Sequence, residues 1–154
     1  MKLKTILGVV ILLAGSLAFA ESDVTKLDEN LKARLSSEEG RTKAGQIKIL
    51  QEAEPAYEAA LKDSYARALG LITDPDSRKE FDQIQVKWLL YRANYLKLLE
   101  SSIKKLTSVE WGLEYRSRID LLRHRIDELD DFYVAVGLLL PDPPRVGFSA
   151  RPGT

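Results

Sequence analysis

Apolar residues recur at every third or fourth position through most of this chain, and this spacing restricts it to helical structure. Residues spaced in this way share one face of an α-helix. No stretch of useful length shows the strict alternation of apolar and polar residues that marks a half-buried strand. The clearest row is Phe81, Ile84, Trp88, Tyr91, Tyr95 and Leu98. Two similar rows are Ile47, Leu50, Tyr57, Leu61, Tyr65, Ala68 and Ile72 before it, and Tyr115, Ile119, Leu122, Ile126, Leu129, Tyr133 and Val136 after it. The sequence therefore predicts an all-α fold with these rows in the core.

Breaks in this periodicity divide the chain into four expected helices. They cover about residues 23–35, 36–72, 75–105 and 107–140. Short connections between long helices favour antiparallel neighbours. The predicted fold is thus an antiparallel bundle of three to four helices, in which long central helices are joined by short loops. The bundle domain is expected to span residues 21–140.

Local sequence signals mark where these helices begin. Residues 36–39 and 107–110 each fit a capping box, in which a Ser or Thr is followed three residues later by Glu. Asp74 is suited to cap the third helix, and Pro75 is suited to its first position. Pro55 lies within the second helix, where its missing N–H and its clash with the preceding turn predict a kink or a fresh start.

The two ends of the chain are expected to lie outside the bundle. Residues 1–20 have the layout of a cleavable secretory signal peptide: two early lysines, an apolar run at 6–13 and an Ala-Phe-Ala cleavage site at 18–20. The run is shorter than the roughly 20 apolar residues of a membrane span, and no cysteine is present to carry a lipid. We therefore expect a periplasmic protein that is not a lipoprotein and has no membrane span after cleavage. Residues 141–154, rich in proline and glycine, are expected to form a disordered tail.

Composition and motifs argue against several classes of function. The chain has 23 basic and 23 acidic residues, and loss of two lysines with the signal peptide leaves it slightly acidic, which argues against nucleic acid as a partner. The absence of cysteine excludes disulfides, thiol catalysis and thiolate metal sites. His124 is the only histidine, and no Gly-x-Ser-x-Gly, phosphate-loop or HExxH motif is present. We therefore expect no enzyme activity, no catalytic residues, no cofactor and no metal, with a cryptic hydrolase as the weakest alternative.

One string in the third expected helix resembles a known family signature. Gln85, Trp88, Tyr91 and Arg92 form a Gln-x-x-Trp-x-x-Tyr-Arg pattern. Two further motifs keep the family order along the chain, with Leu61 and Tyr65 upstream and Arg125, Glu128 and Leu129 downstream. Together the three motifs, spread over about residues 56–133, resemble the LprI-like lysozyme inhibitor family of small exported all-helical bacterial domains.

The chain departs from the family pattern at several positions. Lys62 stands where the upstream motif usually has asparagine. Family members usually carry cysteines that join the two long helices, and Leu96 and Ser117 stand near those positions here. The resemblance thus implies a divergent, cysteine-free relative, in which apolar burial of Leu96 replaces the covalent link.

The motif residues are expected to be mainly structural. Trp88 and Tyr91 share the apolar row of their helix, so both are predicted to lie in the core. Arg92 lies beside that row, and a half-buried guanidinium must find an acceptor because an unpaired buried charge is costly. We expect Arg92 to pair with Asp127 or Glu128 and so to join the third helix to the last.

The resemblance implies a protein that binds and inhibits a lysozyme by occlusion, without catalysis. Acidic groups at helix ends are candidate contacts for a cationic substrate cleft, since complementary charge speeds encounter. The candidate partner surface comprises Asp74 and Asp76 in the turn at 73–77, and Glu110 and Trp111 in the corner at 107–111. The alternative is an envelope interaction or scaffolding module that uses the bundle surface or the leucines at 138–140. Both interpretations leave the identity of the partner and the oligomeric state open.

Overall fold

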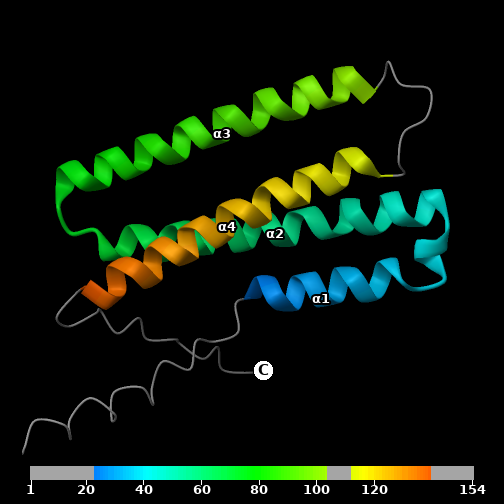
Figure 1. Cartoon of the computed structure of the whole chain (residues 1–154), viewed down its shortest axis with the longest axis horizontal. Helices are drawn as coiled ribbons and strands as arrows, with labels where there is room; N and C mark the ends of the chain where they lie inside the picture. Colours follow the sequence, from blue (N-terminus) through cyan, green and yellow to red (C-terminus); the bar gives the residue numbers. More distant parts are fainter. Residues whose placement is uncertain (1–22, 104–111, 140–154) are drawn as a thin grey trace, which may run out of the picture.

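The computed structural model describes residues 23–103 and 112–139, and in this part the chain forms a helical bundle (Figure 1). The expected signal peptide, the capping box at 107–110 and the C-terminal tail lie outside the described residues. The elements are α1 (Asp23–Leu35), a short 3-10 helix η1 (Glu39–Arg41), α2 (Lys43–Leu71), α3 (Pro75–Ile103) and α4 (Leu113–Leu139). The all-α bundle predicted from the periodicity is confirmed. None of the described helices is long and apolar enough to cross a bilayer.

The centre of the bundle is the pair α2 and α4, which run in the same direction (Figure 1). Gln51 donates a hydrogen bond to the Tyr115 hydroxyl at 2.7 Å, and Arg67 further along α2 pairs with Asp130 further along α4 at 2.8 Å. Short loops force only consecutive helices to be antiparallel. Since α2 and α4 are each antiparallel to α3, they necessarily run in the same direction. That they pack directly against each other as the central pair follows from side-chain fit.

The outer helices α1 and α3 both run antiparallel to the central pair. The Tyr57 hydroxyl of α2 donates to Asp28 of α1 at 2.7 Å, and Arg123 of α4 contacts the same carboxylate at 2.9 Å. One carboxylate therefore links three helices. Burial, together with the hydrogen bond to Asp28, raises the pKa of Tyr57. On the other side of the pair, Phe81 of α3 packs against Phe132 of α4 with ring centroids 5.0 Å apart.

The core forms mainly along the apolar rows of α2 and α4, as the sequence predicts. The most completely buried apolar side chains are Ile49, Leu50, Tyr57, Leu122, Ile126 and Leu129. Burial of one such side chain contributes about 1.5–3 kcal/mol relative to exposure. These two helices therefore supply most of the hydrophobic stabilisation, and α1 and α3 pack on them from outside.

The predicted start of the second helix at residues 36–39 is wrong. The Ser36 hydroxyl instead donates to the Lys32 carbonyl at 2.8 Å and so caps the end of α1. The cap of α2 is Thr42, whose hydroxyl oxygen accepts from the Gly45 N–H at 3.0 Å. Residues 36–42 are needed to reverse the chain so that α2 can pack against α1. In this reversal Gly40 lies so close to α1 that a Cβ would stand 2.1 Å from the Leu35 carbonyl oxygen.

Two proline positions have different outcomes. Pro55 lies inside α2 without ending it, and its ring is on the exposed side of the helix. Pro75 is the first residue of α3, as predicted. The Asp74 carboxylate accepts from the Ser77 N–H at 2.7 Å, and this bond holds the pKa of Asp74 below its usual value. The predicted cap of α3 is therefore confirmed.

The predicted core row of α3 is mostly wrong. Ile84, Tyr91, Tyr95 and Leu98 are 51%, 55%, 38% and 66% exposed. The buried residues of α3 are Phe81, Gln85 and Leu96, and Trp88 is partly buried. At 3.6 residues per turn, the strip that faces the bundle is rotated by about 70° from the apolar row. Polar pairs of Gln85 and Arg92 with the other helices, which hydrophobic periodicity does not register, account for this rotation.

Candidate functional site

The motifs at Gln85–Trp88 and Arg125–Glu128 meet in space around a buried arginine. The guanidinium of Arg125 donates from Nε and Nη2 to the Gln85 amide oxygen at 3.1 and 3.0 Å. Its Nη1 donates to Glu128 at 2.8 Å, and its centre lies 5.8 Å from the ring centroid of Trp88. Arg125 is 9% exposed, so water has little access to its guanidinium. Gln85 and Glu128 supply the hydrogen-bond acceptors that this buried charge needs. The cluster locks the middle of α3 to α4.

The upstream motif lies in the same part of the bundle. Leu61 and Leu129 belong to one core cluster of buried side chains. The Tyr65 ring stacks on Phe81 at 5.6 Å, and its hydroxyl donates to Asp82 at the start of α3. Burial, and then the hydrogen bond to Asp82, raise the pKa of Tyr65 to about 12. The contacts of these motif residues hold helices together.

Arg92 has other partners than the sequence suggests. Its Nη2 donates to Glu54 at 3.0 Å and to Glu58 at 3.1 Å, both on α2. The predicted pairing with Asp127 or Glu128 of α4 is therefore wrong. The arginine that links α3 to α4 is instead Arg125. Two acids four residues apart on α2 present carboxylates to one cation, and that spacing is the signal that sequence reasoning missed.

The ion pair of Arg92 continues into a chain of alternating charges. Glu54 also lies 3.8 Å from Arg118 of α4, and Arg118 pairs with Glu114 at 2.8 Å. The hydrogen bond from Arg118 to Glu114 raises the pKa of the guanidinium. The charge of Arg118 is thus neutralised in part by its own helix and in part by α2. This arrangement positions helices.

Of the candidate partner surface, only Asp74 and Asp76 lie among the described residues. Asp74 and Asp76 are exposed where α2 turns into α3, although the Asp74 carboxylate is engaged as the helix cap. Glu110 and Trp111 lie outside the described residues. The start of α4, which follows them in the chain, is at the opposite end from the turn (Figure 1). A partner that touched both the turn and the start of α4 would have to span the length of α3.

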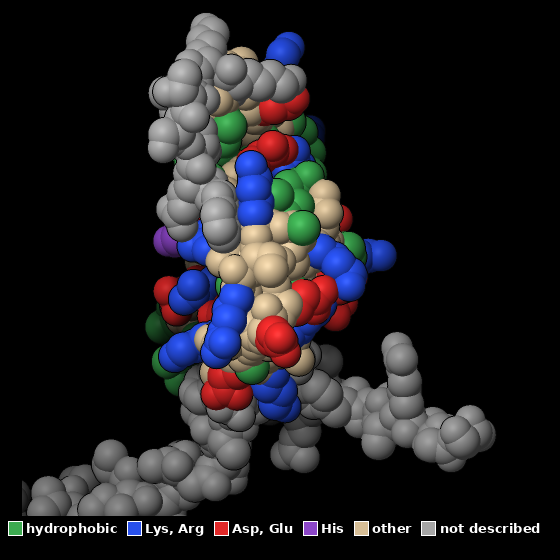
Figure 2. Space-filling model, turned by 90° about the vertical axis from the view of Figure 1, so that its right-hand side faces the viewer, with side chains coloured by type: hydrophobic (Ala, Val, Ile, Leu, Met, Phe, Trp, Pro, Cys, Tyr) green, Lys and Arg blue, Asp and Glu red, His purple; other side chains and the backbone are tan. Residues whose placement is uncertain are grey.

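Exposed leucines lie at the same end of the bundle as this turn (Figure 1). Leu138 and Leu139 in the last turn of α4 are 68% and 83% exposed. We call the surface that comprises Asp74, Asp76, Leu138 and Leu139 the acidic end. The other end of the bundle, seen in Figure 2, carries Lys and Arg side chains interspersed with Asp and Glu.

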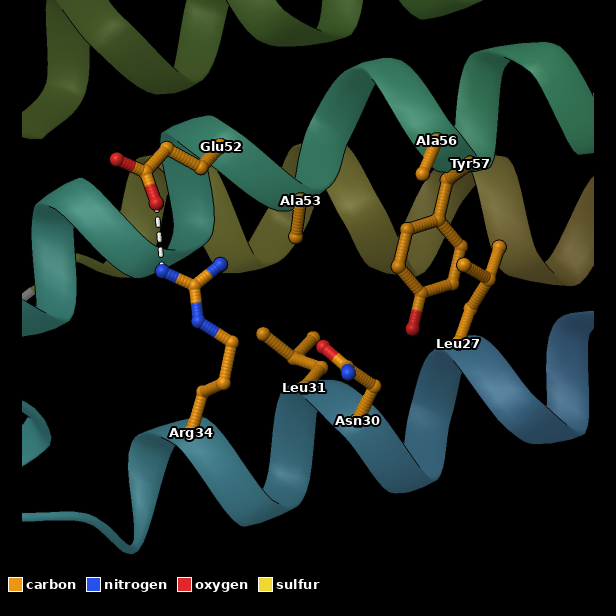
Figure 3. A pocket seen from close by; sticks show the side chains of 8 residues that line it. All are labelled: Leu27, Asn30, Leu31, Arg34, Glu52, Ala53, Ala56 and Tyr57. Carbon is orange, nitrogen blue, oxygen red and sulfur yellow. Dashed lines mark hydrogen bonds and ion pairs between the residues drawn. The ribbon is translucent and has the colours of Figure 1, made fainter.

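A small cavity lies between α1 and α2 (Figure 3). Its volume is about 110 Å³, and Arg34 pairs with Glu52 at 2.5 Å beside it. Sites for organic ligands usually measure about 300–1,000 Å³. The cavity is therefore too small for such a ligand. Its lining residues are Leu27, Asn30, Leu31, Arg34, Glu52, Ala53, Ala56 and Tyr57.

His124 lies on the exposed side of α4 and contacts its own helix. The ring Nδ1 is 2.7 Å from the Asp120 carbonyl oxygen. Within residues 23–103 and 112–139, no three His, Asp or Glu side chains are grouped as metal ligands would be. Comparisons with models of protein families, with curated proteins and with solved structures find no match to this chain.

Proposed function

We propose that this chain is an exported, non-catalytic protein-binding bundle that contacts a cationic protein through the acidic end. The observation that carries the proposal is that exposed apolar and acidic side chains occur at one end of the bundle, with Leu138 and Leu139 at the same end as Asp76. Protein interfaces typically combine an apolar centre with a polar rim. Aspartates at that rim attract a basic partner and speed its encounter.

A lysozyme is the first candidate for this partner. The motif string around Gln85 and Trp88, with its companions on α2 and α4, resembles the signature of the LprI-like lysozyme inhibitors. In this proposal the motif residues maintain the scaffold and the acidic end makes the contact. Inhibition follows from occlusion, because a bulky bundle seated over the substrate cleft keeps the cell-wall polymer out.

The test is lysis of bacterial cell walls by chicken-type, goose-type and invertebrate-type lysozymes in the presence of the purified chain without its first 20 residues. We expect lysis by at least one type to slow as the chain is added. Asp76→Asn and Leu138→Ser should each weaken the effect. Glu38→Gln is the matched control, since Glu38 is an exposed acid at the other end of the bundle whose side chain makes no capping bond. Absence of inhibition with all three types would reject lysozyme as the partner.

A second candidate function is an envelope scaffolding module. It is favoured by the extent of exposed apolar surface, which includes Leu138 and Leu139 and also one side of α3. Exposed apolar patches frequently mark partner sites. A pull-down from periplasmic extract separates the two functions. Recovery of an envelope protein by the unaltered chain but not by Leu138→Ser, without lysozyme binding, would support scaffolding over inhibition.

A further inference from the structure

We propose that α3 is the contact surface of a homodimer, in which the helix packs antiparallel against α3 of a second copy. The contact is made by Ile84, Trp88, Tyr91, Tyr95 and Leu98, which we call the α3 row. The proposal does not depend on the proposed function, because the acidic end and the α3 row are different surfaces. Both can be occupied at once.

The side chains of the α3 row remain largely exposed in the folded chain. The row contains a tyrosine and a leucine that are more than half exposed, Tyr91 at 55% and Leu98 at 66%. The rings of Tyr91 and Tyr95 lie 6.0 Å apart and form a continuous aromatic surface. The helix lies at the edge of the bundle (Figure 1). The chain therefore leaves a large apolar strip without a cover among the described residues.

The spacing of the α3 row is suited to packing against another helix. Its members follow one another at intervals of four, three, four and three residues. This repeat is the seam along which two helices pack in a coiled coil. Two heptads are too few to hold a free helix pair together, but α3 is already held rigid by its contacts with α2 and α4. The second helix therefore meets a preformed surface and loses little conformational entropy on binding.

The order of residue types in the α3 row indicates that the second helix is another copy of α3. Read from either end, the row is aliphatic, aromatic, tyrosine, aromatic, aliphatic. A twofold interface needs such self-complementarity, because each contact between two residues occurs twice. With the axis at Tyr91, Ile84 of one copy faces Leu98 of the other. Trp88 then lies opposite Asn94, one residue from Tyr95 and therefore close enough for the two aromatic rings to meet.

The charges beside the row permit this pairing. The exposed flank of the row carries Glu80, Lys87, Asn94 and Ser101 at intervals of seven residues. Antiparallel pairing about Tyr91 places Glu80 near Ser101 and Lys87 near Asn94. In this pairing no two like charges of this flank face each other. Like charges that faced each other would oppose association. The other flank, with Gln85 and Arg92, is already engaged with α4 and α2.

The available area sets the strength to be expected. The exposed parts of the row amount to about 400 Å² in each copy, taking roughly 200 Å² for a large apolar side chain. With flanking residues the two copies together bury on the order of 1,000 Å², near the lower limit of specific interfaces. We therefore expect a reversible dimer with a dissociation constant in the micromolar range, on the order of 1–100 μM.

Sedimentation velocity of the purified chain over this concentration range tests the dimer. The mass should approach twice that of one copy as concentration rises. Tyr91→Glu places two carboxylates at the axis and should weaken the dimer by about 100-fold or more. Leu90→Glu is the matched control, since Leu90 is 62% exposed on the same helix but points to a different side, and it should leave the dimer intact. A chain that stays monomeric at several hundred micromolar, about a few-fold above this range, or a Tyr91→Glu variant that dimerises normally, would overturn the proposal.

Cross-linking tests the orientation without relying on a destabilising charge. The chain has no cysteine, so single cysteines report only the contacts engineered into it. Tyr91→Cys should form a disulfide-linked dimer readily under mild oxidation, and Leu90→Cys should not. A mixture of Ile84→Cys and Leu98→Cys should give mainly the mixed dimer. Predominant linkage of Ile84→Cys to itself would show a parallel pair and would refute the antiparallel arrangement. Circular dichroism of each variant verifies that it is folded.

Discussion

Replacement of Gln85 by leucine is the sharpest test of how α3 is held to α4. Gln85 is 8% exposed, and its amide oxygen accepts two hydrogen bonds from the buried guanidinium of Arg125. Leucine has a similar volume but no acceptor, so two donors of a charged group lose their partner. Hydrogen bonds to charged groups are worth about 1.5–3 kcal/mol in protein stability. We expect the free energy of unfolding to fall by about 2 kcal/mol, a large share of the roughly 5–15 kcal/mol typical of a domain.

Urea unfolding followed by circular dichroism at 222 nm measures this loss. The midpoint should fall while the slope of the transition stays the same, because little surface area changes. Gln83→Leu is the matched control, since Gln83 is exposed two residues earlier on α3. Its effect should stay within about 0.5 kcal/mol.

A double-mutant cycle with Arg125→Met completes the test. Removal of both polar partners leaves no unsatisfied group, so the double variant should be more stable than the sum of the single losses predicts. The expected coupling between positions 85 and 125 is about 1–3 kcal/mol. A Gln85→Leu variant with the same urea midpoint as the unaltered chain would refute the claim that this buried pair locks α3 in place. A double-mutant cycle without coupling would refute it too.

Three further predictions address the core, the pH dependence and the chain reversal. Leu122→Ala, at a fully buried position, should lower the free energy of unfolding by about 2–5 kcal/mol in urea, whereas Leu139→Ala at an exposed position should have little effect. The folded-state pKa of Tyr65 lies above its ordinary value of 10.0. Its contribution to the free energy of unfolding is therefore complete below pH 10.0 and is lost as pH rises toward about 12. Tyr65→Phe should flatten the decline in urea midpoint over that interval. Gly40→Ala should lower the melting temperature because its Cβ would meet the Leu35 carbonyl, whereas Gly70→Ala, with open space around its Cβ, should match or exceed the unaltered chain.

Sequence patterns predicted the helices correctly where one face alone meets the core. In α2 and α4 the apolar rows and the buried faces coincide, as Tyr57 and Leu122 illustrate. The Asp74 cap of α3 was also predictable, since it depends on neighbours in the chain. The start of α2 was not, because the same Ser36 hydroxyl that fits an N-cap equally reaches the last turn of α1.

The contacts of α3 show the limit of pattern reasoning. Periodicity ranks side chains by hydrophobicity and therefore assigned Tyr91 and Leu98 to the core. It assigns no energy to the partners that Gln85 and Arg92 find on other helices, although an unpaired buried charge costs more than an exposed tyrosine. The motif string was visible in the sequence, but the pairing of Arg92 with Glu54 rather than with an acid of α4 required the positions of all three helices.

The sequence by itself determined that this chain is all-α, where most of its helices lie and which faces of α2 and α4 are buried. Those properties depend on local periodicity and capping, which neighbouring residues specify. Only the tertiary structure decided that the non-consecutive α2 and α4 pack directly against each other and that α3 turns its polar pairs inward. That choice satisfies the buried guanidinium of Arg125 and keeps Arg92 paired, and it leaves the most regular apolar row of the chain on the surface.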